Sequence, residues 1–134
     1  MNENKFTQKA TGAIQTAQNE ALKRKNMQIC PEHLCYALIE QRDGLIYSLF
    51  SKMSLDAPRL LDEIEKLMDK IPAVSGSGRE EGKVYVSPDT DRIIASASKM
   101  ADGMGDEFIS VEHLMLAIFY YADGKLKELL RSFG

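Results

Sequence analysis

The chain has 134 residues, 44% of them hydrophobic, which fits one globular domain burying roughly two-thirds of its unfolded surface. Its 17 basic and 20 acidic side chains give a net charge of -3, and neither sign forms a long block. This balance argues against a nucleic-acid partner, because a protein that binds nucleic acid is expected to have a basic face. The polar first residues lack the apolar region of a signal peptide, and two cysteines are too few for a disulfide framework. We therefore expect a cytoplasmic protein with reduced thiols.

The first half of the chain reads as four helices. Apolar residues recur every three or four positions over residues 7–24, which predicts an amphipathic helix with Thr7 as its cap and an alanine-rich buried face. Pro31 suits the first turn of a second helix, and Leu45 begins the apolar face of a short third one. Asp56 is the expected cap of a fourth helix.

Residues 72–85 break this pattern, because they are rich in glycine, serine and other residues that favour turns. Gly78 is followed by Arg-Glu and not by the Lys-Ser/Thr pair of a phosphate-binding loop, so the stretch is interpreted as a connector. Three further helices are expected after it. They begin after Ser87, after Ser110 and after the Asp-Gly at residues 123–124.

The sequence Glu-His-Leu occurs twice, at residues 32–34 and 112–114, and each copy opens a strongly apolar run. Residues 6–54 align with residues 86–134 without a gap and with 11 identities in 49 pairs, where roughly 3 would be expected by chance. The chain is therefore interpreted as an internal duplication. We predict one all-α domain, a pseudo-twofold bundle of about seven to eight helices, with repeats at residues 6–71 and 86–134 joined by a loop at 72–85. The two Glu-His-Leu helices should form its shared interior.

The apolar run after the second copy, residues 114–122, is too short for the roughly 20 residues that cross a bilayer, so no membrane span is expected. Cys30, His33 and Cys35 match no common zinc spacing, and the second repeat keeps only the histidine, so no metal site is predicted. Cys35 lies inside an apolar run and is interpreted as a packed thiol. His33 and His113 occupy equivalent positions, which indicates a duplicated structural hydrogen bond. No residue set supports a catalytic site, so we do not predict an enzyme.

These features resemble the duplicated N-terminal domain, or Clp repeat domain, of the Clp/heat-shock-100-type AAA+ chaperones. The elements that carry the resemblance are Lys-Phe-Thr at residues 5–7, both Glu-His-Leu copies, the segment at residues 105–110 and the 80-residue repeat. The connector at residues 71–78, followed by Val-Tyr-Val-Ser at 84–87, is most similar to that of the disaggregase branch called ClpB. The resemblance covers essentially the whole chain.

The resemblance implies a mobile domain joined by a flexible linker to two ATPase modules of the same parent chain, which would form a hexamer and bind ATP and magnesium. This chain has no nucleotide-binding motif, so no cofactor is expected in it, and the isolated domain should be a monomer. The implied function is to engage unfolded or aggregated polypeptide and deliver it to the ring, with a DnaK-type chaperone system as collaborator. The fourth helix of the first repeat has no counterpart before Gly134, which suggests a longer protein.

The residues that match the family's polar functional positions are Thr7, Asp106 and Glu112. All three are expected at helix starts, where free backbone N–H groups could receive a carboxylate or a peptide carbonyl; the alternative is that they are ordinary caps. The apolar groove near the pseudo-twofold seam is assigned to Ile14, Ile94 and Phe108.

Two other functions remain open at this point. The chain could be the adaptor-binding N-domain of a protease-coupled Clp ATPase of the ClpC or ClpA type. It could also be a stand-alone α-helical interaction protein.

Overall fold

The computed structural model describes residues 5–41, 44–73 and 84–133. Two short strands, β1 (Gln28–Ile29) and β2 (Tyr85–Val86), accompany the helices of this part of the chain. The helices are α1 (Gln8–Lys23), α2 (Pro31–Glu40), α3 (Leu45–Lys52), α4 (Ala57–Asp69), α5 (Pro88–Gly103), α6 (Val111–Tyr121) and α7 (Gly124–Ser132). The predicted all-α bundle of about seven to eight helices is confirmed, with seven in the described residues. None of these described helices is both long and apolar enough to cross a membrane.

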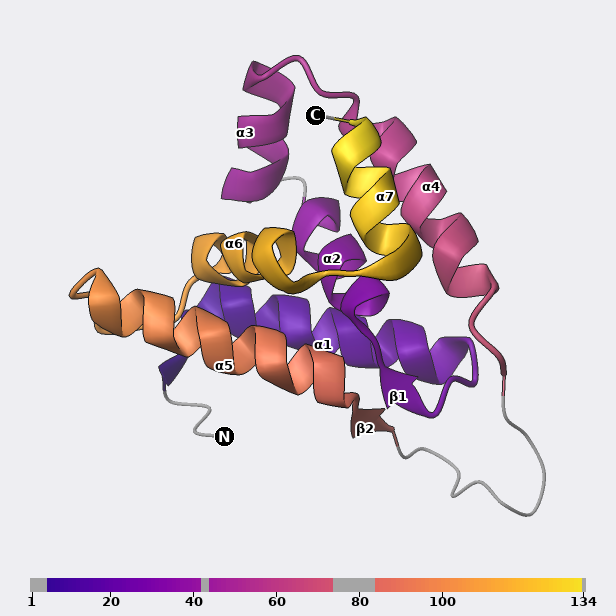
Figure 1. Ribbon diagram of the computed structural model, residues 1–134, viewed down its shortest axis with the longest axis horizontal. Coiled ribbons are helices and arrows are strands. Elements are labelled where there is room, and N and C mark those ends of the chain that lie inside the picture. The colour runs from indigo at the N-terminus through magenta and orange to yellow at the C-terminus, as the bar shows by residue number, and fades with distance from the viewer. Residues whose placement is uncertain (1–4, 42–43, 74–83, 134) are drawn as a thin grey trace.

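The two Glu-His-Leu helices, α2 and α6, pack against each other in the centre of the bundle. The long helix of each half covers its own central helix, α1 against α2 and α5 against α6, so the two halves repeat the same pairing (Figure 1). The helix α4 lies on the other side of α2 and also contacts α3 and α7. The shared interior predicted from the repeat is therefore present.

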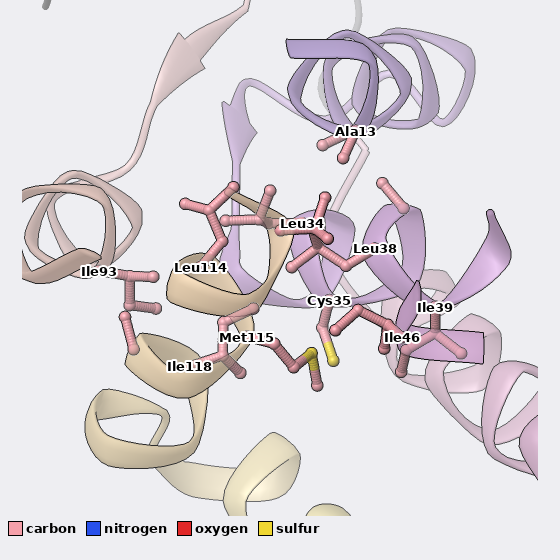
Figure 2. Packing of buried hydrophobic residues seen from close by; sticks show 14 of the residues in the cluster. Ala13, Leu34, Cys35, Leu38, Ile39, Ile46, Ile93, Leu114, Met115 and Ile118 are labelled. Carbon is pink, nitrogen blue, oxygen red and sulfur yellow. The ribbon is translucent and has the colours of Figure 1, made fainter. Parts of the chain in front are cut away.

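Side chains from both halves fill this interior. Leu34 and Leu38 of α2 and Leu114 and Ile118 of α6 are fully buried and lie between the helices (Figure 2). The face that α1 turns towards α2 consists of small residues, which lets the two helix axes approach closely. These fully buried residues are Ala10, Ala13, Ala17 and Ala21.

Helix starts lie where the polar residues predicted them. The side chains of Thr7, Asp56 and Ser87 each accept a hydrogen bond from a backbone N–H three residues later, at 3.1 Å in all three cases. Ser110 accepts the corresponding bond from His113 at 3.4 Å. Since these bonds satisfy N–H groups that the helix itself leaves unpaired, the caps fix where the helices begin.

The sequence analysis did not predict the two short strands. Tyr85 and Val86 pair in parallel with Gln28 and Ile29, so the strand begins inside the stretch that was interpreted as a loop at 72–85. Residues 74–83 of that loop lie outside the described residues. An equivalent parallel bridge joins Phe6 to Ile109, which are the repeat counterparts of Val86 and Ile29 at the 80-residue offset. The start of each repeat is thus paired with the segment before the central helix of the other repeat.

Candidate functional site

Thr7 begins α1 at the junction between the two halves. Its hydroxyl oxygen accepts a hydrogen bond from the N–H of Ala10, and its own N–H donates to the carbonyl of Ile109 at 3.0 Å. The side chain is half-buried. Thr7 therefore acts as a helix cap, and its hydroxyl proton is still able to donate to a bound ligand.

The ends of α1 and α5 position the next polar residues. Each helix is followed by a residue in the left-handed conformation, with φ of 59° at Lys25 and 73° at Gly105. The next N–H group, that of Asn26 in the first half and Asp106 in the second, donates to the helix carbonyl five residues earlier at 2.9 Å. This shared turn brings Asn26 and Asp106 beside the histidine of their own half.

His33 is buried in the first half and forms hydrogen bonds through both of its ring nitrogens. Its Nδ1 accepts a hydrogen bond from the N–H of Cys30 at 2.8 Å, so the neutral ring carries its proton on Nε2 and donates it to Asn26 Oδ1, also at 2.8 Å. Burial, and secondarily the positive charge of Arg24, lower the pKa of His33 to about 4. The ring is therefore a neutral structural group at pH 7.

His113 repeats this arrangement in the second half. Its Nδ1 accepts from the N–H of Ser110 at 2.9 Å, and its Nε2 lies 2.9 Å from Asp106 Oδ2. The duplicated histidine hydrogen bond predicted from the sequence is confirmed. The placement of Asp106 at a helix start was wrong, because α6 begins only at Val111 and Asp106 lies in the turn between α5 and α6. Its side chain is 51% exposed while it holds the histidine.

We predict that Asp106→Asn changes the free energy of unfolding by less than about 1 kcal/mol, because asparagine already holds the equivalent histidine in the first half. Polypeptide binding should weaken in this variant only where it depends on the carboxylate charge. Urea unfolding and peptide titration of the same variant measure the two effects. Asp106→Ala, which removes the acceptor, is the matched control and should be the less stable variant. Equal destabilisation by both would contradict a hydrogen-bonding role.

Glu112 lies exposed in the first turn of α6, where its charge is favourable at the positive end of the helix. Its repeat partner Glu32 is half-buried and lines a pocket of about 300 Å³ with Cys30, Asp89 and Asp123. Burial is the main cause that raises the pKa of Glu32, and the two neighbouring aspartates raise it further. Glu112 was selected from the sequence, whereas the pocket at its repeat partner Glu32 was not predicted.

The Cys30 thiol is not an activated nucleophile. Burial and the charge of Glu32 raise its pKa to about 11, so it is protonated at pH 7. Cys35 is fully buried with a pKa raised to about 12, and its interpretation as a packed thiol is confirmed. The described part of the chain contains no group of three or more histidine, cysteine or acidic side chains placed to hold a metal ion.

A groove of about 550 Å³ lies between α1 and α5 at the pseudo-twofold seam. Ile14 and Ile94, which occupy equivalent positions in the two repeats, both line it. The structure therefore brings these two residues together, but Phe108 is not among the lining residues and lies 46% exposed on the segment before α6. Sequence reasoning missed the remaining lining residues, which are Phe6, Thr11, Gln15, Gln18, Tyr85, Val86 and Asp91.

A second apolar surface lies on α6, so this helix of the shared interior is not buried on every side. Leu116, Phe119 and Tyr120 lie on one face of α6 and are exposed, as are Leu45 and Leu49 on α3, which packs beside α6. The face is apolar in sequence, and period alone does not show whether a neighbouring element covers it.

The chain folds as a duplicated all-α domain with paired Glu-His-Leu helices. A family model described as the Clp repeat (R) N-terminal domain matches residues 5–133. The chain belongs to this family. It is 36% identical to the chaperone protein ClpB of Bacillus anthracis over 133 residues, which are 99% of this chain and 15% of that protein. The ClpB of Rhodopseudomonas palustris is 35% identical over 134 residues, 100% of this chain and again 15% of the relative.

These relatives confirm the likeness to the ClpB branch. The chain spans about 15% of their length. Solved structures show the same fold at lower identity. The N-terminal domain of Hsp104 from Candida albicans has a TM-score of 0.81 and 20% identity, covering 96% of this chain and 81% of that chain. A ClpV N-domain solved in complex with a VipB peptide has a TM-score of 0.73 and 14% identity, covering 98% of this chain and 80% of that chain.

Proposed function

We propose that this chain is the substrate-engaging N-terminal module of an ATP-dependent protein disaggregase of the ClpB type. In this proposal it binds unfolded or aggregated polypeptide and aids delivery to the AAA+ ring of its parent protein. ATP and magnesium bind to that ring and not to this chain. The parent is a cytoplasmic hexamer that works with a DnaK-type chaperone system.

The observation that supports the proposal is the groove at the seam. Its apolar lining includes Ile14, Ile94 and Tyr85, and Tyr85 is 57% exposed, so part of its aromatic ring surface is open to water. An open apolar groove gains free energy by covering this surface with apolar side chains of an unfolded segment. The ClpV N-domain, which has the same fold, was solved with a bound peptide.

Polar contacts in the proposal come from Thr7, Asp106 and Glu112, none of which lines the groove itself. The Thr7 hydroxyl can donate to a peptide carbonyl, and the exposed Glu112 carboxylate can accept from a peptide N–H or a cationic side chain. Asp106 keeps a carboxylate oxygen that its bond to His113 does not use. Phe108 would contact a bound segment only where it extends beyond the groove.

We predict that Tyr85→Ala weakens binding of a permanently unfolded model protein by about tenfold, because the lost apolar contact corresponds to about 1–2 kcal/mol. Ile14→Ser should act in the same direction. Fluorescence anisotropy with a labelled model protein measures both variants.

The matched control is Leu49→Ser, an exposed leucine on α3 that lies outside the groove lining. It should bind as the wild type does. Equal affinity of Tyr85→Ala, Ile14→Ser and the wild type, with circular dichroism showing intact folds, would contradict binding in the groove. An equal loss in Leu49→Ser would instead indicate binding to the surface formed by α3 and α6.

A further inference from the structure

The pairing of β2 with β1 leaves the backbone N–H and C=O of one residue, Val86, without a partner in β1. The N–H of Tyr85 donates to the carbonyl of Met27 at 3.0 Å, and the N–H of Ser87 donates to the carbonyl of Ile29 at 3.2 Å. Successive residues of a strand direct their peptide groups to opposite sides. The N–H and C=O of Val86 therefore point away from β1, and no described residue forms a backbone hydrogen bond with them.

The equivalent residue of the first repeat is arranged in the same way. The N–H of Ile109 donates to the carbonyl of Lys5 at 2.7 Å, and the N–H of Thr7 donates to the carbonyl of Ile109 at 3.0 Å. These bonds involve Lys5 and Thr7 but not Phe6, which occupies the position equivalent to Val86. Among the described residues, Phe6 also has no backbone hydrogen-bond partner.

Both residues line the same groove. Phe6 and Val86 line it together with Ile14 and Ile94, so the two residues with unpaired main-chain groups belong to the apolar lining. A peptide N–H or C=O in an apolar setting gains most from a partner of complementary partial charge. Another polypeptide main chain offers both a donor and an acceptor at the strand spacing.

We propose that the groove binds its polypeptide as an extended strand, whose main-chain N–H and C=O groups pair with those of Val86 or Phe6. Alternate side chains of this strand would contact Ile14 and Ile94. The inference rests on the proposed function and specifies its ligand as an extended, proline-poor apolar segment. Recognition through the main chain is independent of side-chain identity, which suits a domain that meets many different unfolded proteins.

A helical ligand would not use these groups. The interior N–H and C=O groups of a helix are paired within the helix, so only side chains would reach the groove. An extended and a helical occupant therefore differ in their dependence on the main chain of Val86.

The test measures binding of a labelled apolar heptapeptide. It compares two modified peptides and one variant of the protein with the unmodified pair. The first is the same peptide with its internal amides N-methylated, and the second is a lactam-stapled helical analogue. The third is Val86→Pro, which removes the unused N–H while Tyr85 keeps the extended conformation that proline requires before it. Val86→Ala is the matched control, since it shortens the same side chain and keeps the N–H.

We expect N-methylation and Val86→Pro each to weaken binding at least fivefold, and Val86→Ala less than twofold. The stapled helix should bind more weakly than the linear peptide. Equal affinity of the methylated peptide, or tighter binding of the stapled helix, would overturn the strand mode. Because the peptide variants leave the protein unchanged, they decide the matter even where Val86→Pro folds poorly. Equal binding of the unmodified peptide to wild type, Tyr85→Ala and Ile14→Ser would instead contradict binding in the groove, on which the proposed function rests.

Discussion

Replacement of Leu114 by alanine is expected to lower the free energy of unfolding by about 2–5 kcal/mol, as found when a fully buried leucine loses its side chain. Leu114 is completely buried in α6, at the interior that α6 shares with α2 (Figure 2). Helices of both repeats surround it, so the structure can close the resulting cavity only in part. Leu34→Ala should cost a similar amount, because Leu34 is the equivalent residue of α2 and is 1% exposed.

Urea unfolding followed by circular dichroism measures these losses. The matched control is Tyr120→Ala on the outer face of α6, where the ring is 76% exposed and its removal should change stability by less than about 0.5 kcal/mol. A Leu114→Ala protein as stable as Tyr120→Ala would contradict a shared interior between the repeats.

The helices could be predicted from the sequence because their signals act locally. Thr7, Asp56, Ser87 and Ser110 each bond to a backbone N–H only three residues away, so the residue that predicts the helix start is also the one that fixes it. The Glu-His-Leu repeat then identified the central pair of helices, because each copy opens a strongly apolar run.

The strands could not be predicted in this way. Tyr85 and Val86 pair with residues more than fifty positions earlier, and a two-residue strand is too short to show an alternating pattern. The exposed face of α6 could not be predicted for a related reason. Leu116 and Tyr120 are residue types common in protein cores, and only the tertiary arrangement leaves them exposed.

The candidate site was predicted in part. Ile14 and Ile94 lie in one groove because the pseudo-twofold arrangement brings equivalent residues of the long helices to the same seam. Phe108 lies outside that lining. Asp106 was predicted at a helix start, but it lies in the turn between α5 and α6 and bonds from there to His113. The duplication relates this bond to the first half, where Asn26 and His33 form the same pair seven residues apart.

Acidification is expected to destabilise the protein through His33. Its pKa is about 4 in the folded state, compared with the ordinary 6.5 expected once the chain unfolds. Between these values the unfolded chain binds a proton that the folded protein does not, so stability falls as the pH is lowered from about 7 to 4. A shift of this size corresponds to roughly 3 kcal/mol at the acidic end of the window.

His33→Gln is the variant that isolates this effect. Glutamine does not titrate, and at the third position of a helix its side-chain oxygen can still accept the N–H of Cys30. The variant should be less stable at pH 7, because the bond to Asn26 is lost, but its stability should change less between pH 6.5 and 4. Subtracting the two pH profiles removes contributions of other groups, such as Glu32, whose raised pKa gives a slope of opposite sign. Parallel profiles of the two proteins, measured by urea unfolding at each pH, would show that His33 does not cause the acid destabilisation.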